Sequence, residues 1–181
     1  TLRGIYIPAF TVAPTGTFTN NINNNTVALT YGVASGTLQG ITVEATTGTA
    51  TATQNINDNN FTALTGSIAT SAATIAISDV MANLVTNINN NKLTNITTNT
   101  SGAFTFIAHG YIVPAGGTQN INGNSIVTAF SKTGGAGALI MLSSGSSTVA
   151  ANAVSHSNNN FSNITVTGSS AITGISNTDG L

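Results

Sequence analysis

The chain has 181 residues and a net charge of −1, and only 4% of its residues are charged, against about 25% in ordinary soluble domains. Its three basic residues, Arg3, Lys92 and Lys132, are too few for a nucleic-acid surface. The absence of cysteine excludes a disulfide framework. Polarity comes instead from 25 Asn, 32 Thr and 17 Ser, while 40% hydrophobic residues favour a packed core over a disordered tail.

The first predicted strand surrounds Ile5, and its pattern returns through the chain. Apolar and polar residues alternate in Leu38–Val43, which is typical of a β-strand. The recurring column is Ile5, Ile41, Ile75, Ile107, Ile140 and Ile175. Three residues earlier stand mostly apolar residues, namely Leu2, Leu38, Ala72, Phe104, Gly137 and Ile172.

The next predicted segment is the tripeptide Asn-Ile-Asn. It occurs four times at nearly equal intervals, centred on Ile22, Ile56, Ile88 and Ile121. Even spacing of this kind indicates a structural repeat of about 34 residues. Stacked asparagines would form side-chain amide ladders at the bends.

A third predicted segment follows, and its apolar column is Leu29, Leu64, Ile96, Phe130 and Ile164. A hydroxyl residue comes after each of them, namely Thr30, Thr65, Thr97, Ser131 and Thr165. A flat Thr surface would suit ice binding, but the neighbouring column alternates Ala and Asn. We therefore interpret the hydroxyl column as an ordinary outer β face.

These three short segments per unit predict an all-β fold, a right-handed parallel β-helix of about five coils. The alternative is a β-sandwich, pilin-like domain with a donor strand. Ser78–Asn89 has apolar residues at helical spacing; we expect a strand at Ile88 and a short helical turn before it. Thr1–Ile7 and Ile172–Asn177 share one phase without polar caps, so we expect residues 1–181 to be one repeat domain from a longer array.

Two family resemblances emerge from these segments. Asn158–Gly168 and Ile172–Ser176 resemble the Asn/Thr-rich strand repeats of giant Bacteroidota surface proteins, which are parallel β-helices exported as adhesins by the type IX system. This resemblance implies a secreted, non-enzymatic structural or adhesive module. The charge-poor composition also resembles archaeal surface filaments, in which a strand such as Gly4–Val12 would complete the next subunit by donor-strand exchange.

Catalytic chemistry finds little support in the sequence, although some β-helices are polysaccharide-degrading enzymes. Glycoside hydrolysis needs two convergent carboxylates. The four acids, Glu44, Asp58, Asp79 and Asp179, fall at different phases of the repeat. We therefore expect no enzyme activity and no cofactor.

The two histidines and the Asn-rich loops are the remaining candidates for a metal site. His109 is expected where Val43, Ile77 and Leu142 stand in other units, and His156 in the Asn-Ile-Asn column. Two histidines from different columns do not supply a metal's three or four ligands. Asn55–Asn60 alternates oxygens like a calcium loop, but holds only one carboxylate, so we favour an Asn ladder there.

Six Asn-x-Ser/Thr sequons complete the candidate residues, at Asn24, Asn60, Asn95, Asn99, Asn160 and Asn163. Composition alone predicts about as many. The expected location is extracellular or on the cell surface. The expected partners are neighbouring repeats, identical subunits, carbohydrates or cell surfaces, without nucleic acid or membrane insertion; no apolar run approaches the roughly 20 residues of a membrane span.

Overall fold

The computed structural model describes residues 1–9, 16–44, 51–66, 71–111, 113–145 and 153–178, and they form a stack of β coils. Sheet A contains β1 (Leu2–Ile7), β4 (Thr37–Val43), β7 (Ala73–Asp79), β11 (Phe104–His109), β15 (Leu139–Ser144) and β18 (Ile172–Asn177). Sheet B contains β2 (Thr19–Asn21), β5 (Thr53–Asn55), β8 (Val85–Asn87), β12 (Thr118–Asn120) and β16 (Ala153–Ser155). All strand pairs in both sheets are parallel.

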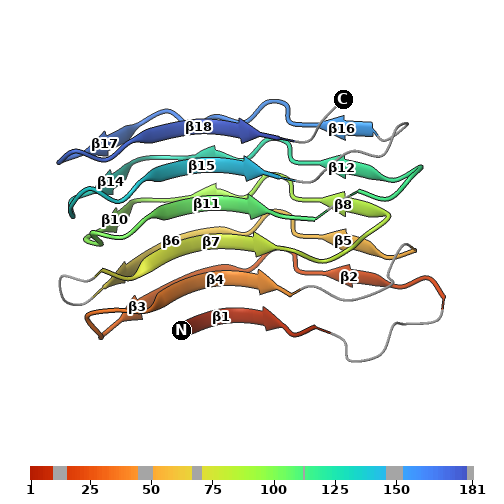
Figure 1. Ribbon diagram of the computed structural model, residues 1–181, viewed down its shortest axis with the longest axis horizontal. Coiled ribbons are helices and arrows are strands. Elements are labelled where there is room, and N and C mark those ends of the chain that lie inside the picture. Colours follow the sequence, from red (N-terminus) through yellow and green to blue (C-terminus); the bar gives the residue numbers. More distant parts are fainter. Residues whose placement is uncertain (10–15, 45–50, 67–70, 112, 146–152, 179–181) are drawn as a thin grey trace.

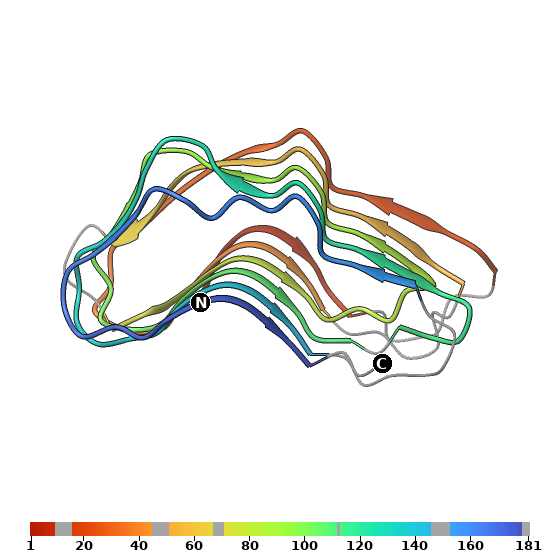
Figure 2. The same ribbon diagram turned by 90° about the horizontal axis from the view of Figure 1, so that it is seen from above.

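Two smaller sheets complete the wall opposite sheet A. Sheet C contains β3 (Thr26–Tyr31), β6 (Asn60–Gly66), β9 (Lys92–Leu93) and β13 (Ser125–Ile126). Sheet D contains β10 (Ile96–Thr98), β14 (Phe130–Lys132) and β17 (Ile164–Val166). Each coil runs from sheet A through sheet B to sheet C, sheet D or both, and then back to sheet A. Successive coils therefore superpose when seen from above (Figure 2).

The expected parallel β-helix, with a coil of about 34 residues, is confirmed, and the described residues contain no helix. The right-handed winding stays a prediction. Stacked coils leave only the inward side chains away from water, which is why each short segment needs its neighbours. None of the described residues forms a helix of the length and apolarity that a membrane span requires.

Sheet A bends where its inward pattern departs from strict alternation. In β4 the consecutive residues Gly40 and Ile41 are both buried, and the same pair of positions is buried in β7, β11 and β15. Gly40 is required there because an added Cβ would lie 2.6 Å from the ring of Phe61, which fills the space across the core. The glycine at this position of β4 thus leaves room for Phe61, whereas β11 and β15 have the larger Phe106 and Met141 there.

The Asn-Ile-Asn column and the Leu29 column both lie inward, as expected. Ile22, Ile56, Ile88 and Ile121 are buried directly after the strands of sheet B. Leu64, Ile96 and Phe130 are buried in the middle of the stack, while Leu29 and Ile164, near its two ends, are half-buried against the core.

The Ile5 column is partly wrong as predicted from the sequence. Strand register places Ile5, Ile41, Ile77, Ile107, Leu142 and Ile175 in one column. Ile75 and Ile140 belong to the outward column beside it, two residues away, with Gln39 and Thr105. The reason is that Ile75-Ala76-Ile77 and Ile140-Met141-Leu142 offer apolar residues at both positions, so hydrophobicity alone does not fix the register.

The expected helical turn before Ile88 is also wrong. Residues 80–84 are irregular; the amide of Met81 donates to Asp79 Oδ1 at 3.2 Å, and Asn83 Nδ2 donates to the Met81 carbonyl at 3.0 Å. Met81 and Ala82 face the core. The spacing that resembles a helix arises because this segment crosses from sheet A to sheet B with its apolar side chains turned inward.

Candidate functional site

Asparagines gather at the bend after sheet B, where the chain follows an Asn-Ile-Asn-x-Asn pattern. The last residue of this pattern forms a column that we name the inner Asn ladder: Asn25, Asn59, Asn91, Asn124 and Asn159. Asn59, Asn91 and Asn124 are fully buried. The sequence reasoning found Asn-Ile-Asn but missed this third asparagine, although it recurs at the same interval.

Each internal member of the inner Asn ladder is saturated with hydrogen bonds. Asn91 Nδ2 donates to Asn124 Oδ1 at 3.0 Å and to the Ile56 carbonyl at 2.8 Å, and its own amide donates to Asn124 Oδ1 at 2.9 Å. Asn91 Oδ1 accepts from the amide and from Nδ2 of Asn59, at 3.1 and 2.9 Å. A buried amide with every group paired links three successive coils without a desolvation penalty.

Two further Asn columns flank this ladder, and the side chains of both form hydrogen bonds between adjacent coils. The outer ladder runs through Asn21, Asn55, Asn87 and Asn120, with Nδ2 to Oδ1 distances of 2.8 to 2.9 Å. In the other column, the side-chain oxygens of Asn23, Asn57, Asn89 and Asn122 accept the backbone amide of the next coil. Together they confirm the predicted amide ladders.

The variable residue of the pattern occupies a left-handed backbone conformation. Its members are Asn24, Asp58, Asn90, Gly123 and Asn158, with φ between 56° and 68°. Asn, Asp and Gly are the residues that tolerate this conformation best. Asp58 is therefore an exposed turn residue, and the oxygens of its neighbours Asn57 and Asn59 accept hydrogen bonds from adjacent coils. This arrangement serves the turn and the ladders rather than a convergent calcium site.

The sequons divide into exposed and engaged asparagines. Asn24, Asn95, Asn160 and Asn163 are exposed, and Asn24, Asn95 and Asn163 take left-handed turns. Two of these exposed side chains also accept hydrogen bonds: Asn95 Oδ1 from Thr128 Oγ1 at 2.6 Å, and Asn160 Oδ1 from the Ser162 amide at 3.1 Å. Asn60 Oδ1 accepts from Thr94 Oγ1 at 2.7 Å, and Asn99 bonds the backbone of Gly66 through both side-chain atoms. The predicted hydroxyl column continues along the outside, where Thr30 pairs with Thr65 and Thr97 with Ser131.

One inward column of sheet A holds three buried polar residues that the sequence reasoning did not group together. Strand register aligns Val43, Asp79, His109 and Ser144. His109 Nδ1 lies 3.4 Å from Asp79 Oδ2, and both side chains are almost completely buried. The predicted alignment of His109 with Val43 is confirmed, whereas its alignment with Ile77 and Leu142 is wrong by two residues.

The second histidine lies near this column on the opposite wall. Gln119 Nε2 lies 2.7 Å from Ser144 Oγ and 2.9 Å from His156 Nε2. His156 follows β16 in the column of Ile121, as predicted, because Ile121 donates its amide to the Ser155 carbonyl at 2.8 Å. The Asp79-His109-Ser144 alignment places acid, base and hydroxyl on successive strands, and all three side chains are buried.

The remaining charged groups hold local structure. Glu44 accepts from Arg3 at 2.9 Å and from Tyr6 at 2.8 Å on the outside of sheet A, and the hydrogen bond to Glu44 raises the pKa of Tyr6. Lys132 is buried, with Nζ 2.6 Å from the Gly134 carbonyl and 3.2 Å from Ser170 Oγ, and this burial lowers its pKa. Asp179 lies outside the described residues.

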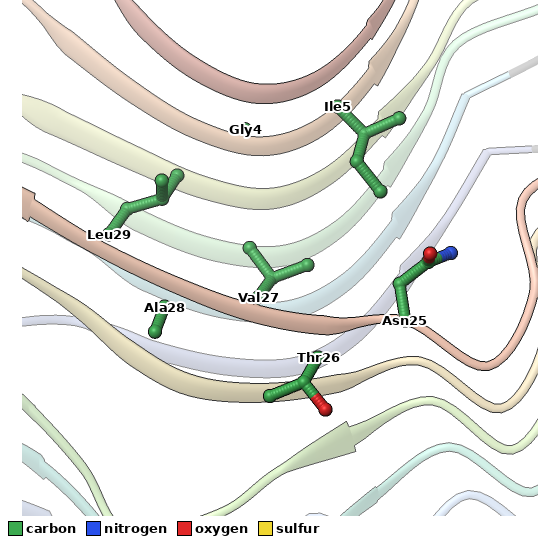
Figure 3. A pocket seen from close by; sticks show the side chains of 7 residues that line it. All are labelled: Gly4, Ile5, Asn25, Thr26, Val27, Ala28 and Leu29. Atoms are coloured by element: carbon green, nitrogen blue, oxygen red, sulfur yellow. The ribbon is translucent and has the colours of Figure 1, made fainter.

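A hollow of about 330 Å³ opens at the first coil, between β1 and β3. Figure 3 shows Val27 and Leu29 pointing toward β1, with Ala28 and Thr26 pointing away. Gly4 faces Val27 here, whereas Gly40 one coil further faces the larger Phe61. The hollow is therefore the open end of the core, lined by apolar side chains and the polar Asn25.

Comparisons of the chain with protein-family models, curated protein sequences and solved structures find no match.

Proposed function

We propose that this chain is a non-enzymatic structural or adhesive repeat module of a large extracellular or cell-surface protein. The observation that carries the proposal is the inner Asn ladder, which ties all its coils through paired, mostly buried amides. Continuous parallel sheets on each wall add backbone hydrogen bonds between the same coils. Such a stack resists bending and local opening, because each coil is fixed by its neighbours.

The outer surface supports the adhesive part of the proposal. Its polar groups are mostly neutral hydroxyls and amides beside some exposed apolar side chains, and charged residues make up only 4% of the chain. Contacts from such groups to sugars or to another surface are individually weak, so useful binding requires many of them together. Membership among Asn/Thr-rich surface adhesins of the type IX kind would place this module in an array where that condition is met.

Force spectroscopy tests the structural role. Pulling the chain by its two ends should release coils one at a time, and each coil of ~34 residues should add about 12 nm of extended chain at ~3.5 Å per residue. Extension without discrete force steps would contradict a rigid stack.

Attachment measurements test the adhesive role. Beads that carry many copies should bind polysaccharide-coated surfaces far better than the free chain does, and salt should change this binding little, because the chain is nearly uncharged. Absence of attachment on every surface would leave only the structural role. Release of products from plant or algal polysaccharides would instead support a β-helix enzyme, which is less favoured than the other alternative, a filament subunit joined by donor-strand exchange.

A further inference from the structure

The two end strands of sheet A, β1 and β18, reveal a mismatch in strand number between the walls of the stack. Among the described residues, sheet A has six strands and sheet B has five. Sheet C has four strands, and the bridge from Ser125 to Asn160 adds one more parallel step. A second copy placed on β18 with its own β1 in position would therefore leave one empty level in the opposite wall (Figure 1).

Strand β18 matches β1 in three of the four inward columns of sheet A; in the fourth, β18 has Asn177 where β1 has Ile7. Following the register through sheet A aligns Leu2 with Ile172 and Ile5 with Ile175. Both strands also have a glycine between these residues, Gly4 and Gly174. Ile172 and Ile175 are 57% and 48% exposed on the open edge of β18. Thus β18 of one copy fits beside β4 of another copy with the apolar, glycine and apolar positions that β1 presents there, while Asn177 would take the place of Ile7 beside Val43.

The Asn ladder is polar in a way that matches this arrangement. At every internal step, the asparagine of one coil donates its amide and Nδ2 to Oδ1 of the asparagine in the next coil. At the first coil, Asn25 Oδ1 accepts no hydrogen bond from the described residues. At the last coil, the Asn159 amide has no acceptor among them. A second copy would bring this donor and this acceptor together.

A polar clamp holds β1 in its place beside β4. Arg3 Nε donates to Gln39 Oε1 at 2.8 Å and Arg3 Nη2 to Glu44 Oε1 at 2.9 Å, while Tyr6 donates to Glu44 Oε2 at 2.8 Å. The guanidinium also lies 4.2 Å from the centre of the Tyr6 ring. β18 has Thr173 and Ser176 at the corresponding positions, so it would compete for β4 without these contacts.

We propose that a second copy of this chain is a partner, and that β18 of one copy displaces β1 from β4 of the next to continue all sheets and the Asn ladder. The interaction is heterologous and repeats head to tail, so it builds filaments. The Arg3–Glu44–Tyr6 clamp limits it by keeping β1 bound. This inference names the partner of the proposed structural module and rests on that role.

Engineered disulfides test the proposal in a chain that contains no cysteine. In the displaced arrangement Thr173 of one copy lies beside Gln39 of the next, at the spacing of adjacent strands that a disulfide spans. Within one copy these residues lie on β18 and β4, which three other strands separate. The variant Gln39→Cys/Thr173→Cys should therefore give a series of covalent oligomers under oxidation. Gln39→Cys/Ser176→Cys, three residues out of register, is the matched control.

Further variants test whether the Arg3–Glu44–Tyr6 clamp limits oligomer formation and whether β1 is displaced. Adding Arg3→Ala and Tyr6→Phe should raise the oligomer yield several-fold, whereas Lys92→Ala, at the exposed position of β9, should not. Crosslinking of Arg3→Cys/Thr173→Cys instead would mean that copies meet without displacement of β1, and would overturn the proposal. Monomers throughout, or equal yield from the control pair, would also overturn it. Circular dichroism establishes that each variant is folded, and stepwise force unfolding of the monomer would leave the structural role standing.

Discussion

Replacement of Asn91 by alanine should reveal how much the inner Asn ladder contributes to stability. The substitution removes two donated and two accepted side-chain hydrogen bonds. It leaves three buried groups without these partners: the Asn59 amide, one Asn59 Nδ2 hydrogen and the Ile56 carbonyl. Each such group costs about 1–3 kcal/mol, so Asn91→Ala should destabilise the chain by about 4 kcal/mol.

Thermal and urea unfolding followed by circular dichroism measure this effect. For a chain of this size, about 4 kcal/mol corresponds to a fall of roughly 8–16 °C in Tm. Asn87→Ala is the matched control, because Asn87 belongs to the same coil and to the partly exposed outer ladder. Water can replace its lost partners, so the control should cost about 1 kcal/mol or less. Equal shifts in Tm for the two variants would refute the assignment of the inner ladder as the main polar tie.

Three further substitutions test the core and its buried charges. Ile107→Asp places an unpaired carboxylate in the core and should cost about 3–5 kcal/mol, whereas Ala108→Asp on the outward face should cost far less; an unchanged Tm would show that Ile107 is not interior. Asp79→Val alone should destabilise more than Asp79→Val/His109→Val. Both variants remove the acceptor of the Met81 amide, but the single variant also leaves the buried His109 without its carboxylate, and Val43 already fits this column; urea unfolding of the two should rank them in that order. Burial lowers the pKa of Lys132, so the unfolded chain binds the Lys132 proton more tightly than the folded chain does, and the free energy of unfolding should rise as the pH increases through the folded pKa toward 10.5. Tyr6, whose pKa is raised, contributes in the opposite direction. Subtracting the pH profile of Lys132→Met, which keeps Tyr6, cancels that contribution and should show the rise.

The evenly spaced Asn-Ile-Asn tripeptides made the solenoid predictable. Ile22, Ile56, Ile88 and Ile121 stack because the segment around them has nearly constant length between coils. Register in sheet A was harder to predict. The spacing along the column of Ile5, Ile41, Ile77, Ile107, Leu142 and Ile175 is uneven: it is longest in the first two steps and shortest between Ile77 and Ile107. A constant period of about 34 residues therefore misplaces some coils by the two positions that separate equivalent faces of a strand.

The same irregularity hid the Asp79–His109 pair. These two residues are closer in sequence than any other neighbours in their column, and the alignment made from the sequence placed His109 beside Ile77 rather than Asp79. The steps along this column differ in length, yet the strands of sheet A stay paired in one register. These differences in length change which side chains meet in the core, and no local pattern records that change.

By itself, the sequence determined the architecture of this protein: repeated apolar columns, asparagines at the bends and almost no charge permit burial only by stacking. The tertiary structure alone decided which asparagines are buried, which residues of sheet A face inward and how its charged groups pair. The physical reason is that the periodic pattern specifies a repeating backbone but not the register between neighbouring coils. Which side chains meet depends on that register, and the packing of the whole stack selects it.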